Sequence, residues 1–388
     1  MTNSWNPLHR LFTPIHPIPA GMYHYQSPPD DPRNYRLHLR LERDGGGVLI
    51  INASTILHLN QTAAEYAYYL IQNEPVDNVI KKMVARYHVN PEQAREDYVD
   101  LTERIQILIN TPDLDPITFL EFERQQPFSG NLSAPYRLDC ALTYRLASEE
   151  PSDAAPIERV ARELNTDEWI KIIDEAWKIG IPHIVFTGGE PTLRDDLPEL
   201  ISHAESNGQV SGLLTDGLRL SDRSYLDTLL RTGLDHLLIV LQPDNEGSWK
   251  AVENAMIEDL SVSVHLTVTK GNHQRVSDIL ERISGIGVGQ VSLSVEDASL
   301  SDSLKSARDK AAGLHLELVW NLPVPYSAMH PVALEVGDAE MEGAGRAWLY
   351  VEPDGDVLPS QGVPKVLGNL LRDPWEKIWK GTGNNSLG

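Results

Sequence analysis

The chain has 388 residues and a formal net charge of -23, with the apolar and charged content of a globular protein. This length is enough for two or three domains with buried cores, and the negative charge argues against nucleic acid or an anionic membrane surface as a partner. No apolar stretch approaches the roughly 20 residues of a membrane span, and the N-terminus lacks the layout of a signal peptide, so we expect a cytoplasmic protein that binds small molecules or a basic peptide.

The N-terminal third predicts a small domain made of a hairpin and three helices. Residues 1–32 are rich in proline and predict an extended arm. From residue 33, an alternating stretch at 35–42 and an apolar run at 48–52 are separated by turn residues, which predicts a β-hairpin. Asn60 is a typical N-cap for the first of three amphipathic segments. The predicted helices cover residues 61–71, 76–87 and 91–109.

A unit of this kind, residues 33–111, is either a winged helix that reads DNA or a peptide-docking domain. Between residues 60 and 110 there are five basic and eight acidic side chains, which is the wrong balance for phosphate contacts. The segment Leu57–Asn60 followed by these helices is similar to the peptide-recognition (RRE/PqqD-like) domains of ribosomal-peptide maturation systems. The resemblance implies that a leader peptide binds as an added strand at the sheet edge. A structural module without a ligand is the alternative.

A proline-rich linker at 112–135 leads into a region, 136–335, in which strands alternate with helices. Repeated strand-helix units build a parallel barrel, complete or partial. The fold class predicted is α/β, with a partial (β/α)6 TIM-type barrel. Its predicted strands cover residues 137–145, 183–187, 212–216, 237–241, 262–268, 291–295 and 315–320.

The central strand ends in Gly188-Gly189-Glu190-Pro191, and the chain is organised around this motif. The carboxyl end of such a strand is where parallel α/β folds place ligands. The two glycines let the backbone come close to a ligand, and Glu190 offers a carboxylate suited to an ammonium group. Pro191 fits the first turn of the helix that follows.

This motif resembles the methionine-binding motif of radical S-adenosylmethionine (SAM) enzymes. Residues 215–217 also resemble that family's Thr-Asn-Gly turn, with Asp216 in place of asparagine, and Gln242 ends the next strand where the family often has a ribose-contacting residue. The resemblance implies S-adenosylmethionine as the ligand. The cofactor-binding residues it implies are Gly188, Gly189, Glu190, Pro191, Thr215, Asp216, Gly217 and Gln242.

The C-terminal segment, 336–388, predicts two short strands around an Asp354-Gly355 turn and a last helix at 375–379. The order of these features is similar to the SPASM/twitch-like extension of peptide-maturing radical SAM enzymes. That extension usually holds auxiliary iron-sulfur clusters on several cysteines. Here it has none, and Ser360 stands near the position of the first expected thiol.

Radical SAM chemistry needs a [4Fe-4S] cluster on three thiolates, so that one iron stays free to chelate SAM. The family's Cys-x3-Cys-x2-Cys motif follows the first barrel strand, and its three positions fall here on Leu146, Glu150 and Asp153. The chain contains one cysteine, Cys140. The sequence therefore predicts that no [4Fe-4S] cluster is bound.

A second register of the same motif, starting at Cys140, would place Tyr144 and Ala147 at the other two positions and gives no cluster either. Glu149, Glu150 and Asp153 are suitable ligands for a hard cation such as Mg²⁺, although a solvated acidic loop is the simpler interpretation. Cys140 itself fits a small buried residue.

The resemblance as a whole implies a degenerate, non-catalytic radical SAM-like protein of a peptide-modification system. Its expected partners are a precursor peptide or a partner maturation enzyme, with no nucleic acid and no membrane. One alternative is an active radical SAM peptide maturase, which needs thiols from another chain or a cysteine-bearing form. Another is a SAM-binding or metal-dependent enzyme of other chemistry.

Overall fold

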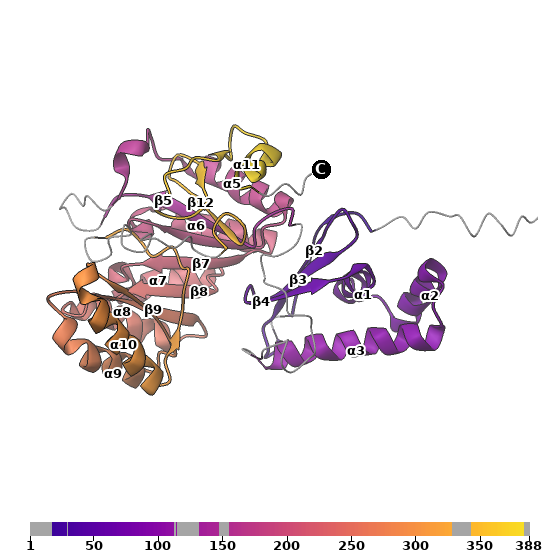
Figure 1. The fold of residues 1–388 in the computed structure, drawn as a ribbon, viewed down its shortest axis with the longest axis horizontal. Coiled ribbons are helices and arrows are strands. Elements are labelled where there is room, and N and C mark those ends of the chain that lie inside the picture. Colours follow the sequence, from indigo (N-terminus) through magenta and orange to yellow (C-terminus); the bar gives the residue numbers. More distant parts are fainter. Residues whose placement is uncertain are drawn as a thin grey trace, which may run out of the picture. The chain divides into compact units, whose positions relative to one another are not determined.

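The computed structural model describes residues 18–28, 30–111, 114, 132–146, 155–327 and 343–383. The chain divides into two compact units, residues 1–127 and 128–388 (Figure 1). Within the described ranges, no helix combines the length and the apolar character that crossing a membrane requires.

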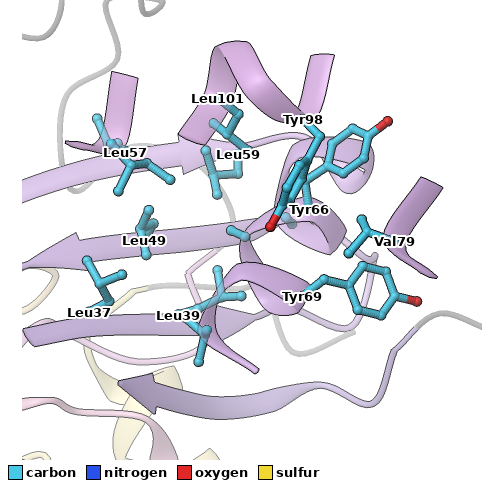
Figure 2. Packing of buried hydrophobic residues seen from close by; sticks show 14 of the residues in the cluster. Leu37, Leu39, Leu49, Leu57, Leu59, Tyr66, Tyr69, Val79, Tyr98 and Leu101 are labelled. Carbon is cyan, nitrogen blue, oxygen red and sulfur yellow. The ribbon is translucent and has the colours of Figure 1, made fainter. Parts of the chain in front are cut away.

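The N-terminal unit is a four-stranded antiparallel sheet in the order β1-β2-β3-β4, followed along the chain by three helices. Leucines on one face of the sheet, such as Leu49 and Leu59, pack against tyrosines of the helices, such as Tyr66 and Tyr98 (Figure 2). The elements are β1 (Gly21–Gln26), β2 (Arg36–Leu41), β3 (Gly47–Ile51), β4 (Thr55–Leu59), α1 (Gln61–Ile71), α2 (Val76–Tyr87) and α3 (Pro91–Asn110).

Side-chain caps determine where α1 and α3 begin. The Asn60 side chain accepts a hydrogen bond from the amide of Ala63 (2.9 Å), and Asn90 does the same for the amide of Glu92 (2.8 Å). Each cap satisfies a backbone N–H group that has no partner inside the helix. The predicted hairpin is confirmed as β2 and β3, and the three predicted helices are confirmed to within one residue.

Two strands of this sheet were not predicted. Residues 21–26 were assigned to the arm at 1–32 but form β1, which pairs with β2. Residues 55–59 form β4 on the other side of β3. The prolines of the arm lie outside β1 on both sides, so they delimit a strand whose formation depends on a partner elsewhere in the chain. Residues 1–17 lie outside the described residues.

The second unit is built on a ten-stranded sheet in the order β11-β10-β9-β8-β7-β6-β5-β12-β13-β14. Strands β5 to β11 are parallel, and α6, α8 and α10 contact β7, β9 and β10. The strands are β5 (Arg137–Thr143), β6 (His183–Gly188), β7 (Val210–Thr215), β8 (His236–Val240), β9 (Ser261–Val268), β10 (Gln290–Val295), β11 (Glu317–Leu318), β12 (Trp348–Val351), β13 (Asp356–Leu358) and β14 (Gly368–Asn369).

Six strand-helix units of this sheet confirm the predicted partial barrel (Figure 1). The first barrel helix, residues 166–179, shows how the local sequence determines where a helix begins and ends. Asn165 and Glu168 form a reciprocal capping box at its N-terminus, and Gly180 ends it in the left-handed region (φ 98°). The main helices are α5 (Thr166–Ile179), α6 (Leu197–Asn207), α7 (Arg223–Arg231), α8 (Glu246–Met256), α9 (Val276–Ile286), α10 (Ser301–Gly313) and α11 (Trp375–Gly381).

The strand predicted at 315–320 is reduced to Glu317–Leu318. The chain leaves the sheet soon afterwards, because Pro323 and Pro325 have no N–H group to donate to a strand ladder.

The C-terminal extension belongs to the same sheet as the barrel. β12 and β13 form the predicted hairpin, with Gly355 at a φ of 87° in the turn. β12 also pairs in parallel with β5, the first barrel strand. This pairing was not predicted, since it joins residues about 200 positions apart. Residues 328–342 and most of the linker predicted at 112–135 lie outside the described residues.

Candidate functional site

The candidate site begins at the carboxyl end of β6, where Gly188 and Gly189 lie against the end of β5. The amide of Gly189 donates to the Thr143 carbonyl (2.7 Å), and the amide of Glu190 donates to the Arg145 carbonyl (2.8 Å). A Cβ atom on Gly188 would lie 2.2 Å from the Thr143 carbonyl oxygen, and one on Gly189 would lie 2.2 Å from that of Arg145. Both glycines are therefore needed for close approach to the end of β5 and the residues after it, a steric role that the sequence did not predict, and their predicted role beside a ligand stays a prediction.

Glu190 is the centre of a buried hydrogen-bond network and is 3% exposed. Its Oε1 atom accepts hydrogen bonds from the Thr192 amide (2.9 Å), the Thr192 hydroxyl (2.5 Å) and the Thr215 hydroxyl (2.7 Å). Its Oε2 atom accepts from the Asp216 amide (2.7 Å). The carboxylate is thus held by the ends of two neighbouring strands, β6 and β7.

The electrostatics of this network favour a positively charged ligand. Burial and the neighbouring Asp216 carboxylate raise the pKa of Glu190 to about 8, while hydrogen bonds from Thr192, Thr215 and Asp216 oppose the shift. Burial also raises the pKa of Asp216. Two coupled carboxyl groups of this kind retain a proton near neutral pH, and an ammonium group can take the place of that proton.

The predicted turn at 215–217 lies directly against Glu190. The Thr215 hydroxyl, besides donating to Glu190, accepts a hydrogen bond from the Gly217 amide (3.1 Å), and Asp216 accepts one from the Leu218 amide (2.9 Å). Gly217 has a φ of 76°, and a Cβ atom there would lie 2.7 Å from Ile239. Pro191 is buried and begins the short helical turn Pro191–Leu193.

Gln242 is not part of this network in the described residues. Its amide donates to the Ser248 hydroxyl (3.1 Å), and its side-chain oxygen accepts from Asn245 (3.3 Å), so these bonds tie it to its own loop and to α8. Sequence reasoning missed Thr192, which gives Glu190 two of its hydrogen bonds. The signal was available, since a carboxylate directly before a proline at the start of a helical turn caps the amide two residues later.

The positions that would carry the cluster thiols are only partly described. Leu146 is half-buried, and Glu150 and Asp153 lie outside the described residues. Cys140 is fully buried in β5, and burial raises its pKa well above the usual thiol range. Among the described residues no group of three or more histidine, cysteine or acidic side chains is placed to hold a metal ion.

With this geometry established, comparison with known proteins identifies the barrel. Residues 140–295 match the family model of the radical SAM superfamily. These residues form a radical SAM domain.

Curated relatives of the radical SAM domain include two PqqA peptide cyclases. The enzyme of Streptomyces rochei is 27% identical over 286 residues, which cover 64% of this chain and 76% of the relative. The enzyme of Bradyrhizobium diazoefficiens is 27% identical over 279 residues, covering 63% and 72%. The chain is thus similar to peptide-modifying members of the superfamily.

Solved structures show the same fold over most of the chain. SuiB of Streptococcus suis bound to S-adenosylmethionine has a TM-score of 0.56 at 15% identity, covering 92% of this chain and 88% of that chain. SuiB bound to the precursor peptide SuiA has a TM-score of 0.54 at 16% identity, with the same coverage.

Radical SAM enzymes use S-adenosylmethionine and a [4Fe-4S] cluster, and the side chains of this chain suit the first of these and not the second. Glu190 is a carboxylate, the group that pairs with an ammonium ion such as the one that S-adenosylmethionine carries. A [4Fe-4S] cluster needs three thiolates, and the single thiol of this chain is buried and held protonated. The residues present therefore do not fit the cluster.

Proposed function

We propose that this protein is a degenerate radical SAM-like component of a peptide-modification system, which binds a precursor peptide and S-adenosylmethionine without radical chemistry. The observation that carries the proposal is the donor set: the chain keeps the Glu190 network and has one cysteine, which is buried in β5. Similarity to PqqA peptide cyclases supports peptide modification as the setting.

Anaerobic reconstitution with iron and sulfide tests the absence of radical chemistry. The expected result is a colourless protein that retains no stoichiometric iron and does not cleave S-adenosylmethionine. A brown protein with bound iron and cleavage activity would favour the alternative of an active maturase that obtains thiols from another chain.

Titration calorimetry tests the ligand site separately. S-adenosylmethionine should bind the wild-type protein, and Glu190→Gln should weaken binding about tenfold or more, because glutamine keeps an acceptor but cannot give up a proton to become the carboxylate that pairs with the ammonium group. Glu253→Gln, on the exposed surface of α8, is the matched control. No heat from any of the three proteins would rule out the ligand.

The precursor peptide is proposed to bind the edge of the N-terminal sheet. Among the described strands, β4 pairs only with β3, which makes it an edge strand of this sheet, and an edge strand is where an added peptide strand pairs. Leu57 and Leu59 of this edge strand belong to the apolar core, together with Leu101 of α3 (Figure 2).

Hydrogen exchange of the full chain with a synthetic PqqA or SuiA peptide tests this docking. A bound strand should slow exchange at residues 55–59 and leave the opposite edge strand, residues 21–26, unchanged. Unchanged exchange along β4 with both peptides would contradict docking at this edge.

A further inference from the structure

A short extended segment, residues 321–327, runs along the barrel interior and is here called the strap. It follows β11 and begins at Asn321, whose carbonyl accepts a hydrogen bond from the Arg137 guanidinium at the start of β5 (2.7 Å). Further along, the Pro323 carbonyl accepts from the Thr187 hydroxyl of β6 (2.6 Å). The strap therefore passes along β5 and β6 from their N-terminal ends towards the candidate site.

The strap reaches the glycine motif itself. The amide of Tyr326 donates to the carbonyl of Gly188 (2.7 Å), and the Val324 carbonyl accepts from the side-chain amide of Gln361 (2.8 Å). Four main-chain groups of the strap are thus bound by residues of the barrel and of the extension. This is how a protein holds an extended peptide ligand, through its backbone.

The side chains of the strap pack on an apolar surface inside the barrel. Val324 is 1% exposed, and with Leu322 it packs against Val185, Leu214, Leu238 and Val240. The strand register places these four residues on one face of the sheet, since Leu214 pairs with Leu238 and residues two apart share a face. We call this surface the inner apolar surface.

Proline suits such an occupant. Pro323 and Pro325 have no N–H groups, so the strap brings fewer donors that need partners inside the barrel. The inner apolar surface offers few acceptors, because its side chains are aliphatic. The ligand that suits the inner apolar surface is therefore an extended, apolar peptide that contains proline.

We propose that the inner apolar surface is a peptide-binding site, and that the strap occupies it in cis and excludes other peptides. A tethered segment acts at an effective concentration of roughly millimolar, so a free peptide of the same chemistry at micromolar concentration does not displace it. This inference deepens the proposed function, because it names a second peptide site. It rests on the proposed function only for the assumption that a precursor peptide is a ligand of this protein.

The test is to release the strap and offer its sequence in trans. Val324→Asp places a charge on the inner apolar surface and should expel the strap, whereas Val366→Asp, at a side chain that is 53% exposed, is the matched control. Hydrogen exchange across residues 321–327 should become about tenfold faster in the first variant only. A synthetic peptide copying residues 320–327 should then bind this variant about tenfold more tightly than it binds the wild type.

A milder variant keeps the test decisive if Val324→Asp fails to fold. Thr187→Val with Gln361→Ala removes two hydrogen bonds to the strap without adding a charge, and circular dichroism reports whether the fold is kept. The control peptide carries Leu322→Ser and Val324→Ser and should not bind.

Two results would overturn the proposal. One is that exchange across the strap stays as slow as in β6 in the milder variant, with no peptide bound in trans, which would make the strap a permanent part of the core. The other is equal binding of the peptide to wild type and variants. Both outcomes are independent of S-adenosylmethionine binding, so they are distinguishable from a failure of the Glu190 site.

Discussion

At the scale of single residues, the Glu190 carboxylate depends on a set of hydrogen bonds from its neighbours. It is buried, and it accepts hydrogen bonds from the two donors of Thr192, from Thr215 and from the Asp216 amide. Removing the carboxylate would leave these donors without partners, which costs about 1–3 kcal/mol for each buried group. For this reason the tests above use glutamine, which keeps one acceptor, and not alanine.

The raised pKa of Glu190 predicts a pH dependence of stability. The folded protein binds this proton more tightly than the unfolded chain, so the contribution is fully present below the usual carboxyl pKa of about 4. It is lost as the pH rises through the folded-state pKa of about 8. Urea unfolding at several pH values between these limits should show a slope that Glu190→Gln flattens by up to ~1.4 kcal/mol per pH unit.

Asp216→Asn provides the matched comparison, because it removes the neighbouring charge and leaves Glu190 in place. The pKa of Glu190 should then fall, and the pH profile should lie between those of the wild type and Glu190→Gln. Parallel profiles for all three proteins would show that the carboxyl pair does not share a proton.

A side chain at position 188 should destabilise the fold for a purely steric reason. The φ of Gly188 is 132°, and a Cβ atom at this position would lie only 2.2 Å from the Thr143 carbonyl oxygen, which leaves no room for a side chain. Gly188→Ala should lower the free energy of unfolding by about 2 kcal/mol or more, because both atoms that clash are held by the backbone. Gly285→Ala in α9 is the control, since its Cβ meets nothing within 4 Å and alanine favours a helix. Equal stability of the two variants, measured by urea unfolding, would contradict the steric argument.

At the scale of elements, a buried carboxylate joins α1 to α2 in the N-terminal unit. Glu65 of α1 is 3% exposed and accepts hydrogen bonds from the hydroxyls of Tyr69 (3.0 Å) and Tyr87 (2.7 Å). The guanidinium of Arg86 lies 3.1 Å from the same carboxylate. A buried charge of this kind is tolerated only while its partners stay in place.

Arg86→Met should therefore destabilise the N-terminal unit by about 2 kcal/mol, somewhat less than a fully buried pair because Arg86 is partly exposed. The measurement is hydrogen exchange of α1 amides in the full chain. The double variant Glu65→Gln, Arg86→Met should recover part of the loss, since the uncompensated charge is gone. If the double variant is no better than Arg86→Met, the charge is not what the arginine compensates.

At the scale of the whole molecule, strand pairing and a buried cluster of side chains join the barrel to the C-terminal extension. β12 extends the sheet beside β5, and Glu352, which follows β12, accepts a hydrogen bond from the Tyr144 hydroxyl (3.1 Å) and pairs with Arg159. Tyr144 also contacts Tyr326 of the strap, with ring centroids 5.4 Å apart. A buried polar and aromatic cluster thus links the end of β5, the strap and the extension.

If the lack of thiols is what prevents cluster binding, cysteines introduced at the family positions should allow the chain to bind iron. The triple variant Leu146→Cys, Glu150→Cys, Asp153→Cys restores the spacing that holds a [4Fe-4S] cluster, so anaerobic reconstitution should yield about four irons per chain. Tyr144→Cys with Ala147→Cys, which completes the spacing from Cys140, is the control and should bind none, because Cys140 is buried in β5. Iron analysis and visible absorption provide the measurement. Iron in the control alone would mean that the register is wrong.

Local features of this protein were readable from the sequence. Asn60, Asn165 and Gly180 act through hydrogen bonds and backbone conformations within a few residues, so the helix limits they mark could be predicted. The parallel barrel followed from alternating strands and helices. Residues 215–217 beside Glu190 could be named from their resemblance to a family turn, whereas Thr192 was missed and Gln242 lies outside the network.

Contacts between segments far apart in the sequence were decided by the tertiary structure alone. The sequence does not indicate that β1 joins β2, that β12 lies beside β5, or that the strap fills the barrel interior, because such contacts arise from whichever surfaces the folded elements leave uncovered. The same reason explains why the sequence did not show that the glycines of the motif also pack against the end of β5. A glycine in the sequence indicates that another group can approach the backbone closely, and only the folded chain shows which group does so.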